Sequence, residues 1–95
     1  MKPETLMTHF ENLAERVGVK IIRGKGDFHG GSCLVQKKNV IVLNTVKPIE
    51  QRLRVLAKGF IQRDLSDVYL VPALRAYIEE IQDTLFSHET TKVID

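Results

Sequence analysis

Cysteine and long apolar runs are scarce in this sequence. Cys33 is its one cysteine, which excludes an internal disulfide framework and a zinc site built from several cysteines. Apolar runs such as Val40 to Leu43 are far shorter than the roughly 18 residues that cross a bilayer. The chain opens without the basic, apolar and small-residue regions of a signal peptide. We therefore expect a cytoplasmic protein that does not enter a membrane.

The length and composition are those of one small globular domain. The chain has 95 residues, of which 43% are hydrophobic and 27% charged, and these fractions exclude a disordered or collagen-like chain. A chain of this length buries only about 60 to 65% of the surface that its unfolded form exposes, so it can build one core. We predict a single domain over residues 1–87 and a frayed tail over residues 88–95.

The small net charge of +2 conceals a segregation of charge along the chain. Residues 20–63 hold ten basic and two acidic side chains, which gives +8. Residues 1–19 give −1 and residues 64–95 give −5. Such asymmetry is typical of a nucleic-acid surface, and equally of two surfaces that attract each other within a monomer or across an interface.

Three prolines divide the chain and mark the starts of three predicted helices, because proline suits the first helical turn. Apolar residues at helical spacing predict helices that run from Pro3 to Gly18, over residues 48–65, and onward from Pro72. Between the first two helices, β-branched segments predict strands at 19–23, 32–36 and 40–44, and the last two form a hairpin. The fold class is α+β: a small, mainly antiparallel three-stranded sheet covered by helices, in the order α-β-β-β-α-α.

The loop between the first two strands is rich in glycine and holds polar side chains. Its residues Lys25, Asp27 and His29, with Cys33 just beyond it and Arg75 as an anion partner, are the candidate small-ligand or metal site over residues 24–33. Their spacing matches no standard zinc pattern, and a strand rather than a helix follows the glycines, which excludes a P-loop. We therefore assign no metal and no cofactor, and a plain connection between strands is the simpler interpretation.

A second alternative is weak, non-specific nucleic-acid binding through the basic face of the helix at 48–65. The candidate residues on this helix are Arg52, Arg54, Lys58 and Arg63, and Lys37 and Lys38 of the predicted hairpin are added to them. The sequence lacks tryptophan, and its few aromatic residues fall mostly at apolar helical positions, where core packing explains them better than base stacking does.

One stretch of the sequence resembles a known family. Val40 to Asn44, Pro48 and the run Gln51 to Ala57 are similar to the residues that precede the zinc motif of ImmA/IrrE-type metallopeptidases. The resemblance implies a zincin-like core of helix and sheet. In that family a His-Glu-x-x-His motif follows, whereas this chain has Lys58, Gly59 and Gln62 at the three motif positions. The resemblance therefore implies a shared layout without peptidase activity.

The chain also resembles a group of small uncharacterised bacterial proteins with a Gly-Asp-Phe loop, Gly-x-Cys, Asn-x-x-x-Pro and Pro-Ala-Leu-Arg. That resemblance implies no activity. The function that the sequence favours is non-enzymatic protein association, as a homodimer or with another protein, because so small a core gains stability from an interface. The basic second helix and the acidic third helix, with Glu79, Glu80 and Asp83, are the surfaces expected to meet.

Overall fold

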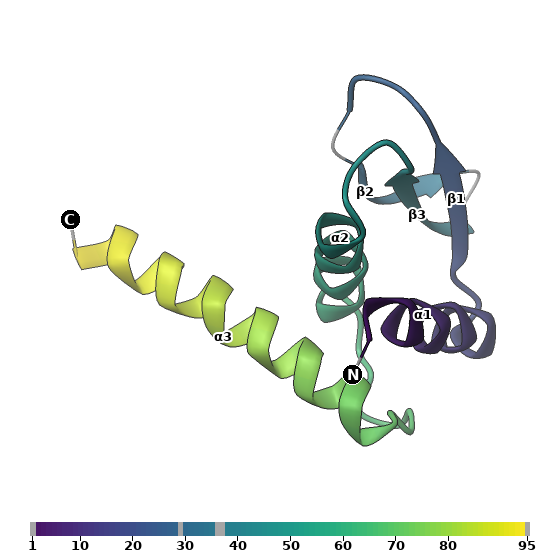
Figure 1. The fold of residues 1–95 in the computed structure, drawn as a ribbon. Coiled ribbons are helices and arrows are strands. Elements are labelled where there is room, and N and C mark those ends of the chain that lie inside the picture. Colours follow the sequence, from purple (N-terminus) through teal and green to yellow (C-terminus); the bar gives the residue numbers. More distant parts are fainter. Residues whose placement is uncertain (1, 29, 36–37, 95) are drawn as a thin grey trace.

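The computed structural model describes residues 2–28, 30–35 and 38–94, and it describes their side chains except those of 32–35, 38 and 86–94. Six elements follow one another along the chain (Figure 1). They are α1 (Pro3–Val17), β1 (Lys20–Gly24), β2 (Gly30–Val35), β3 (Lys38–Asn44), α2 (Ile49–Ile61) and α3 (Pro72–Ile94). The predicted α+β class and the order α-β-β-β-α-α are confirmed.

The sheet has the strand order β1-β3-β2. β2 and β3 pair antiparallel, with Gly30 opposite Leu43, which confirms the predicted hairpin. β1 and β3 pair parallel, with Gly24 opposite Asn44. The sheet is therefore mixed, whereas the sequence predicts a mainly antiparallel one. The reason is that the segment after β1 crosses the end of β3, so that β2 does not pair with β1. β3 then lies between these two strands.

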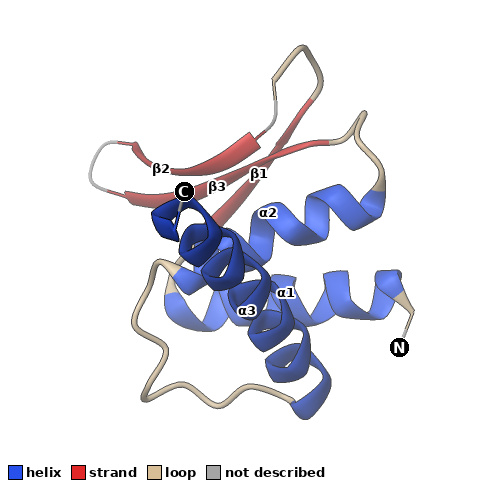
Figure 2. Cartoon of the chain, turned by 90° about the vertical axis from the view of Figure 1, so that its left-hand side faces the viewer, coloured by secondary structure: helices blue, strands red, loops and turns tan. Residues whose placement is uncertain are grey.

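α1 and α2 cover one face of the sheet, and α3 packs on these two helices (Figure 2). α1 packs against β1, and α2 packs against both β2 and β3. Between the layers lies one apolar core, in which the ring of Phe10 stacks on Phe60 at 5.9 Å and meets Tyr77 edge-on at 6.0 Å. Ile41 and Leu43 of the central strand are fully buried in it, as expected for the strand with neighbours on both sides.

The helix ends follow local chemistry. α1 begins at Pro3 and ends at Val17, and the next residue, Gly18, has a φ of 75°, the left-handed value that closes a helix. α2 ends at Ile61, so the predicted helix over 48–65 extended four residues too far at its C-terminal end. The reason lies in the next turn, where the Ser66 N–H donates to the Asp64 carboxylate at 3.0 Å and thereby competes with helical bonding.

α3 is the longest element and extends away from the rest of the molecule (Figure 1). Its first half packs on the body through the buried residues Leu74 and Ile78. The helix continues to Ile94, and so includes most of the segment for which the sequence predicts a frayed tail. Within the described part of the chain, no helix has the length and apolarity that a membrane crossing needs.

Candidate functional site

A groove of about 590 Å³ lies between the start of β2 and the outer side of α2, and we call it the β2–α2 groove. It is lined by Gly30, Gly31, Pro48, Glu50, Gln51, Arg54, Val55, Lys58, Gly59 and Gln62. Its volume is that of a typical ligand or peptide pocket. The groove joins two regions that the sequence suggested separately: the end of the glycine-rich loop and the basic face of the second helix.

The amphipathic pattern of α2 creates the polar wall of this groove. Leu53, Leu56 and Phe60 are turned into the core, and the helical period therefore turns Arg54 and Lys58 outward, where both are exposed. Against these two cations the groove has one anion, Glu50. The groove therefore carries a net positive charge.

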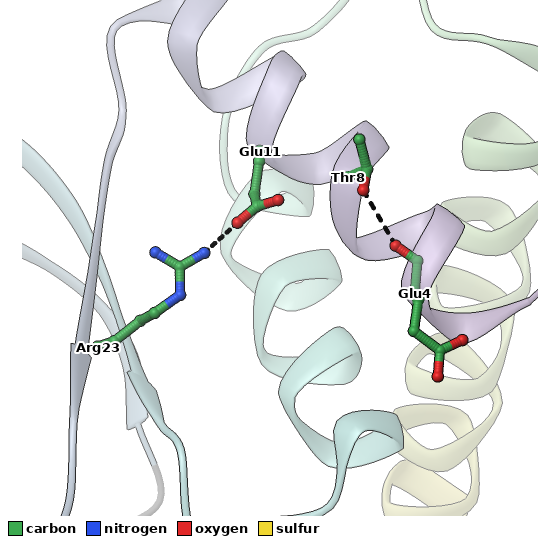
Figure 3. Close-up of polar contacts among 4 residues, drawn as sticks. All are labelled: Glu4, Thr8, Glu11 and Arg23. Carbon is green, nitrogen blue, oxygen red and sulfur yellow. Dashed lines mark hydrogen bonds and ion pairs between the residues drawn. The ribbon is translucent and has the colours of Figure 1, made fainter.

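The two edges of the sheet differ in charge. β1 carries Lys20 and Arg23, and Arg23 forms an ion pair with Glu11 of α1 (Figure 3). Charged side chains of this kind protect an edge strand against pairing. β2, the other edge, contains glycine, serine, cysteine, leucine and valine and no charged residue. The unprotected edge is therefore the one beside the β2–α2 groove.

The glycine-rich loop is held by the end of the central strand. The Asn44 side chain is only 1% exposed, and its Nδ2 amide donates to the carbonyl oxygens of Gly26 and Phe28 at 2.7 and 2.6 Å. Its Oδ1 accepts a hydrogen bond from the Val46 N–H at 3.1 Å. These bonds use both donor positions of the side-chain amide and one of its two acceptor positions. They hold the loop across the end of β3.

The glycines of this loop differ in how closely they are packed. The ring of Phe28 lies against Gly24 and Gly26, so that a Cβ atom on either would be 3.4–3.5 Å from it. At Gly30 the φ is +93°, and a Cβ atom would lie 2.6 Å from the Val42 carbonyl oxygen. Only glycine fits where β2 enters the sheet so close to β3. The close approach of β2 to β3 thus explains Gly30.

The structure describes the side chains of three of the five predicted ligand residues. Lys25 and Asp27 are exposed in the loop, whereas His29 lies outside the described residues. The backbone of Cys33 lies in β2, opposite Val40, and its side chain is not described. Among the described residues there is no group of three or more His, Cys, Asp or Glu side chains that could hold a metal ion.

Arg75 lies in the first turn of α3 and lines a separate cavity of about 320 Å³. The other residues that line this cavity come from the end of α2, the segment that links it to α3, and α3 itself, and they include Arg63 and Glu79. No described residue of the glycine-rich loop lines it. The structure thus gives Arg75 surroundings different from those of Lys25 and Asp27.

The structure describes the side chains of four of the six predicted nucleic-acid residues. The Arg52 Nε donates to the Lys47 carbonyl oxygen at 3.1 Å. Arg63 donates to the Gly59 carbonyl oxygen, and its guanidinium lies 5.9 Å from the ring centre of Phe60. Lys37 lies outside the described residues, and Lys38 begins β3 with its side chain undescribed. Of the six, the structure brings Arg54 and Lys58 together.

Two titratable groups outside the groove have shifted pKa values. Burial raises the pKa of the Tyr77 hydroxyl, which nearby Arg54 opposes in part. The hydrogen bond from the Ser66 backbone lowers the pKa of the Asp64 carboxyl. Neither side chain lines the β2–α2 groove, so the groove is defined by its shape and its two cations.

Comparison with protein-family models, curated proteins and solved structures gives no match to this chain. The resemblance to the ImmA/IrrE-type metallopeptidases therefore stays a prediction. The three positions that correspond to the family's zinc motif, Lys58, Gly59 and Gln62, all line the β2–α2 groove. The sequence singled out the glycine-rich loop and the cations of the second helix separately, but it did not predict that they adjoin, because no local signal says which strand lies beside α2.

Proposed function

We propose that this chain binds another polypeptide, which adds to the sheet as a strand along the open edge of β2. The observation that carries the proposal is the uncharged edge of β2 beside the β2–α2 groove. An edge strand presents unpaired backbone N–H and C=O groups that can pair with a further chain. Strand addition to such an edge is a common mode of peptide recognition.

The β2–α2 groove would supply selectivity for side chains, which an unprotected strand edge alone lacks. In an added strand, alternate side chains point to the helix side of the sheet. There they would enter the β2–α2 groove, whose wall is formed by the outer residues of α2. Backbone pairing would provide affinity and the groove would select side chains. The proposal therefore uses both features and requires no catalytic group.

The charge of α2 favours a different polypeptide over a second copy. Strands lie about 4.8 Å apart and α2 packs under both β2 and β3, so two copies joined at β2 would place their α2 helices about 10 Å apart. The exposed cations of both copies would then face each other. Like charges brought together in this way disfavour the pairing.

Selection from a random library of seven-residue peptides tests the proposal. We expect selected peptides to bind the purified chain and to shift the amide resonances of β2 and of the outer side of α2, while those of β1 stay unchanged. N-methylation of alternate residues on one edge of a bound peptide should abolish binding, and N-methylation on the other edge should preserve it.

The proposal fails if the library yields no binder, or if the bound peptides shift β1 instead of β2. It also fails if N-methylation of either edge has the same effect, because a peptide that pairs as a strand uses the N–H groups of one edge only. If sedimentation equilibrium shows a dimer without added peptide, the polypeptide that pairs with β2 is a second copy of this chain.

A further inference from the structure

We infer that the strand accepted by β2 carries two acidic side chains at positions i and i+2, which pair with Arg54 and Lys58. The inference rests on the proposed function and specifies its partner. Both cations line the β2–α2 groove and both are exposed. Among the described residues the one ion pair joins Arg23 and Glu11, so neither cation of the groove is already paired with a carboxylate.

The spacing of the two cations matches that of an extended chain. Arg54 and Lys58 are four residues apart in α2, which places them on one side of the helix and about 6 Å apart along its axis. Side chains at i and i+2 of a strand share one face and lie about 6.6 to 6.8 Å apart. Two carboxylates on alternate residues can therefore reach both cations at once.

The connection between β3 and α2 sets the direction of this match. Only four residues, Thr45–Pro48, separate the two elements, so the chain turns back and α2 packs under β2 and β3. β2 also runs opposite to β3. The helix and β2 thus leave the same end of the sheet, and a strand added to β2 would pass along the outer side of α2.

Two acidic side chains of this chain limit the pattern further. Glu50 lies one turn before Arg54 in the same groove, and it disfavours a third acidic residue in the partner at that end. Glu80 of α3 lines a smaller cavity together with Arg54 without forming an ion pair with it. Glu80 therefore competes for Arg54 at a distance, and its removal should strengthen binding.

Four synthetic peptides test the pattern: TVEVEVT, its amide counterpart TVQVQVT, the isomer TVEEVVT with its acids on opposite faces, and TVKVKVT. We expect TVEVEVT to bind about tenfold more tightly than TVQVQVT and TVEEVVT at low salt, and TVKVKVT to bind most weakly. The advantage of TVEVEVT should shrink to about twofold at 0.5 M salt, because exposed ion pairs are screened.

Protein variants test the two cations. Arg54→Gln and Lys58→Gln should each weaken TVEVEVT about three- to tenfold and leave TVQVQVT unchanged, while Glu80→Gln should tighten TVEVEVT about twofold. Lys20→Gln removes an exposed cation from the opposite edge and serves as the matched control, with no effect on any peptide. Calorimetric titration gives each affinity.

The outcomes separate this inference from the proposed function. Equal binding of TVEVEVT and its isomer, or unchanged affinity in both cation variants, overturns the acidic pattern while strand addition stands. Failure of all four peptides, together with an unproductive library, overturns both. In a competition experiment, a twelve-residue oligothymidylate and unlabelled TVEVEVT each displace labelled TVEVEVT. If the oligothymidylate does so at the lower concentration, the groove is a nucleic-acid surface and the inference is overturned.

Discussion

Asn44 is the one buried polar side chain among the residues whose side chains the structure describes, and the crossing from β1 to β2 depends on it. Its amide binds two carbonyl oxygens of the loop, and its oxygen accepts from the Val46 N–H. The sequence shows Asn44 as the polar end of an apolar strand and nothing more. Its role becomes visible only when the loop is seen to pass over the end of β3.

Asn44→Ala should lower the free energy of unfolding by about 2 to 4 kcal/mol, because two carbonyl oxygens and one N–H lose their buried partner. Urea unfolding followed by circular dichroism gives the value. Asn39→Ala changes an exposed residue of the same strand and should cost less than about 0.5 kcal/mol. Equal effects of the two substitutions would contradict the role assigned to Asn44.

At the scale of elements, the periodic helices were predictable and the pairing of strands was not. The apolar stripe of α1, with Phe10 and Leu13, is buried as its spacing predicts. The β2–β3 hairpin follows from a short polar connection. The position of β1 depends instead on where the glycine-rich loop leads the chain, and a parallel pair between distant segments has no local signal.

The charges of β1 lead to a prediction about that edge. Replacement of Lys20 and Arg23 together by threonine should leave the chain folded, because their exposed charges and the ion pair with Glu11 contribute little to stability, about 1 kcal/mol or less. The double variant should self-associate at concentrations where the parent is monomeric, since its second edge is no longer protected. Sedimentation velocity measures the association.

Lys25→Thr is the control for that experiment, because it removes an exposed charge from the loop and leaves the edge strand intact. It should sediment like the parent chain. If the double variant also stays monomeric at high concentration, the charges of β1 do not protect it, and the contrast drawn between the two edges of the sheet is unfounded.

For the whole molecule, the charge segregation in the sequence becomes an arrangement of surfaces. The basic α2 and the acidic α3 pack on each other, yet the contact is made by apolar residues such as Leu53 and Leu74. The described residues show no ion pair between the two helices. The cations of α2 therefore stay available to the β2–α2 groove, and the association predicted from the sequence remains a proposal.

The core also gives the whole molecule a pH dependence. Burial raises the pKa of Tyr77 above its ordinary value of 10.0, so the folded state keeps a proton that the unfolded state releases above about pH 10. Stability is therefore full below that pH and falls as the pH rises toward the folded-state pKa. The urea midpoint of the chain should drop between pH 9 and 11 (about one unit on each side of the ordinary value).

Tyr77→Phe keeps the ring that packs on Phe10 and removes the ionisable hydroxyl. The variant should lose less of its urea midpoint than the parent over the same pH range. Tyr69 and the lysines are common to both proteins and cancel in the comparison. Parallel curves for the two proteins would show that Tyr77 does not contribute to the alkaline loss.

The class of the fold, the order of its elements and the cations of α2 follow from the sequence alone, because helical period, glycine, proline and charge act over a few neighbouring residues. The parallel pairing of β1 with β3 became known only from the tertiary structure. The tertiary structure also decided that Arg54 and Lys58 share a groove with Gly30 and Gly31. The pairing of distant strands depends on how the whole chain buries its apolar surface, and that requirement is not local.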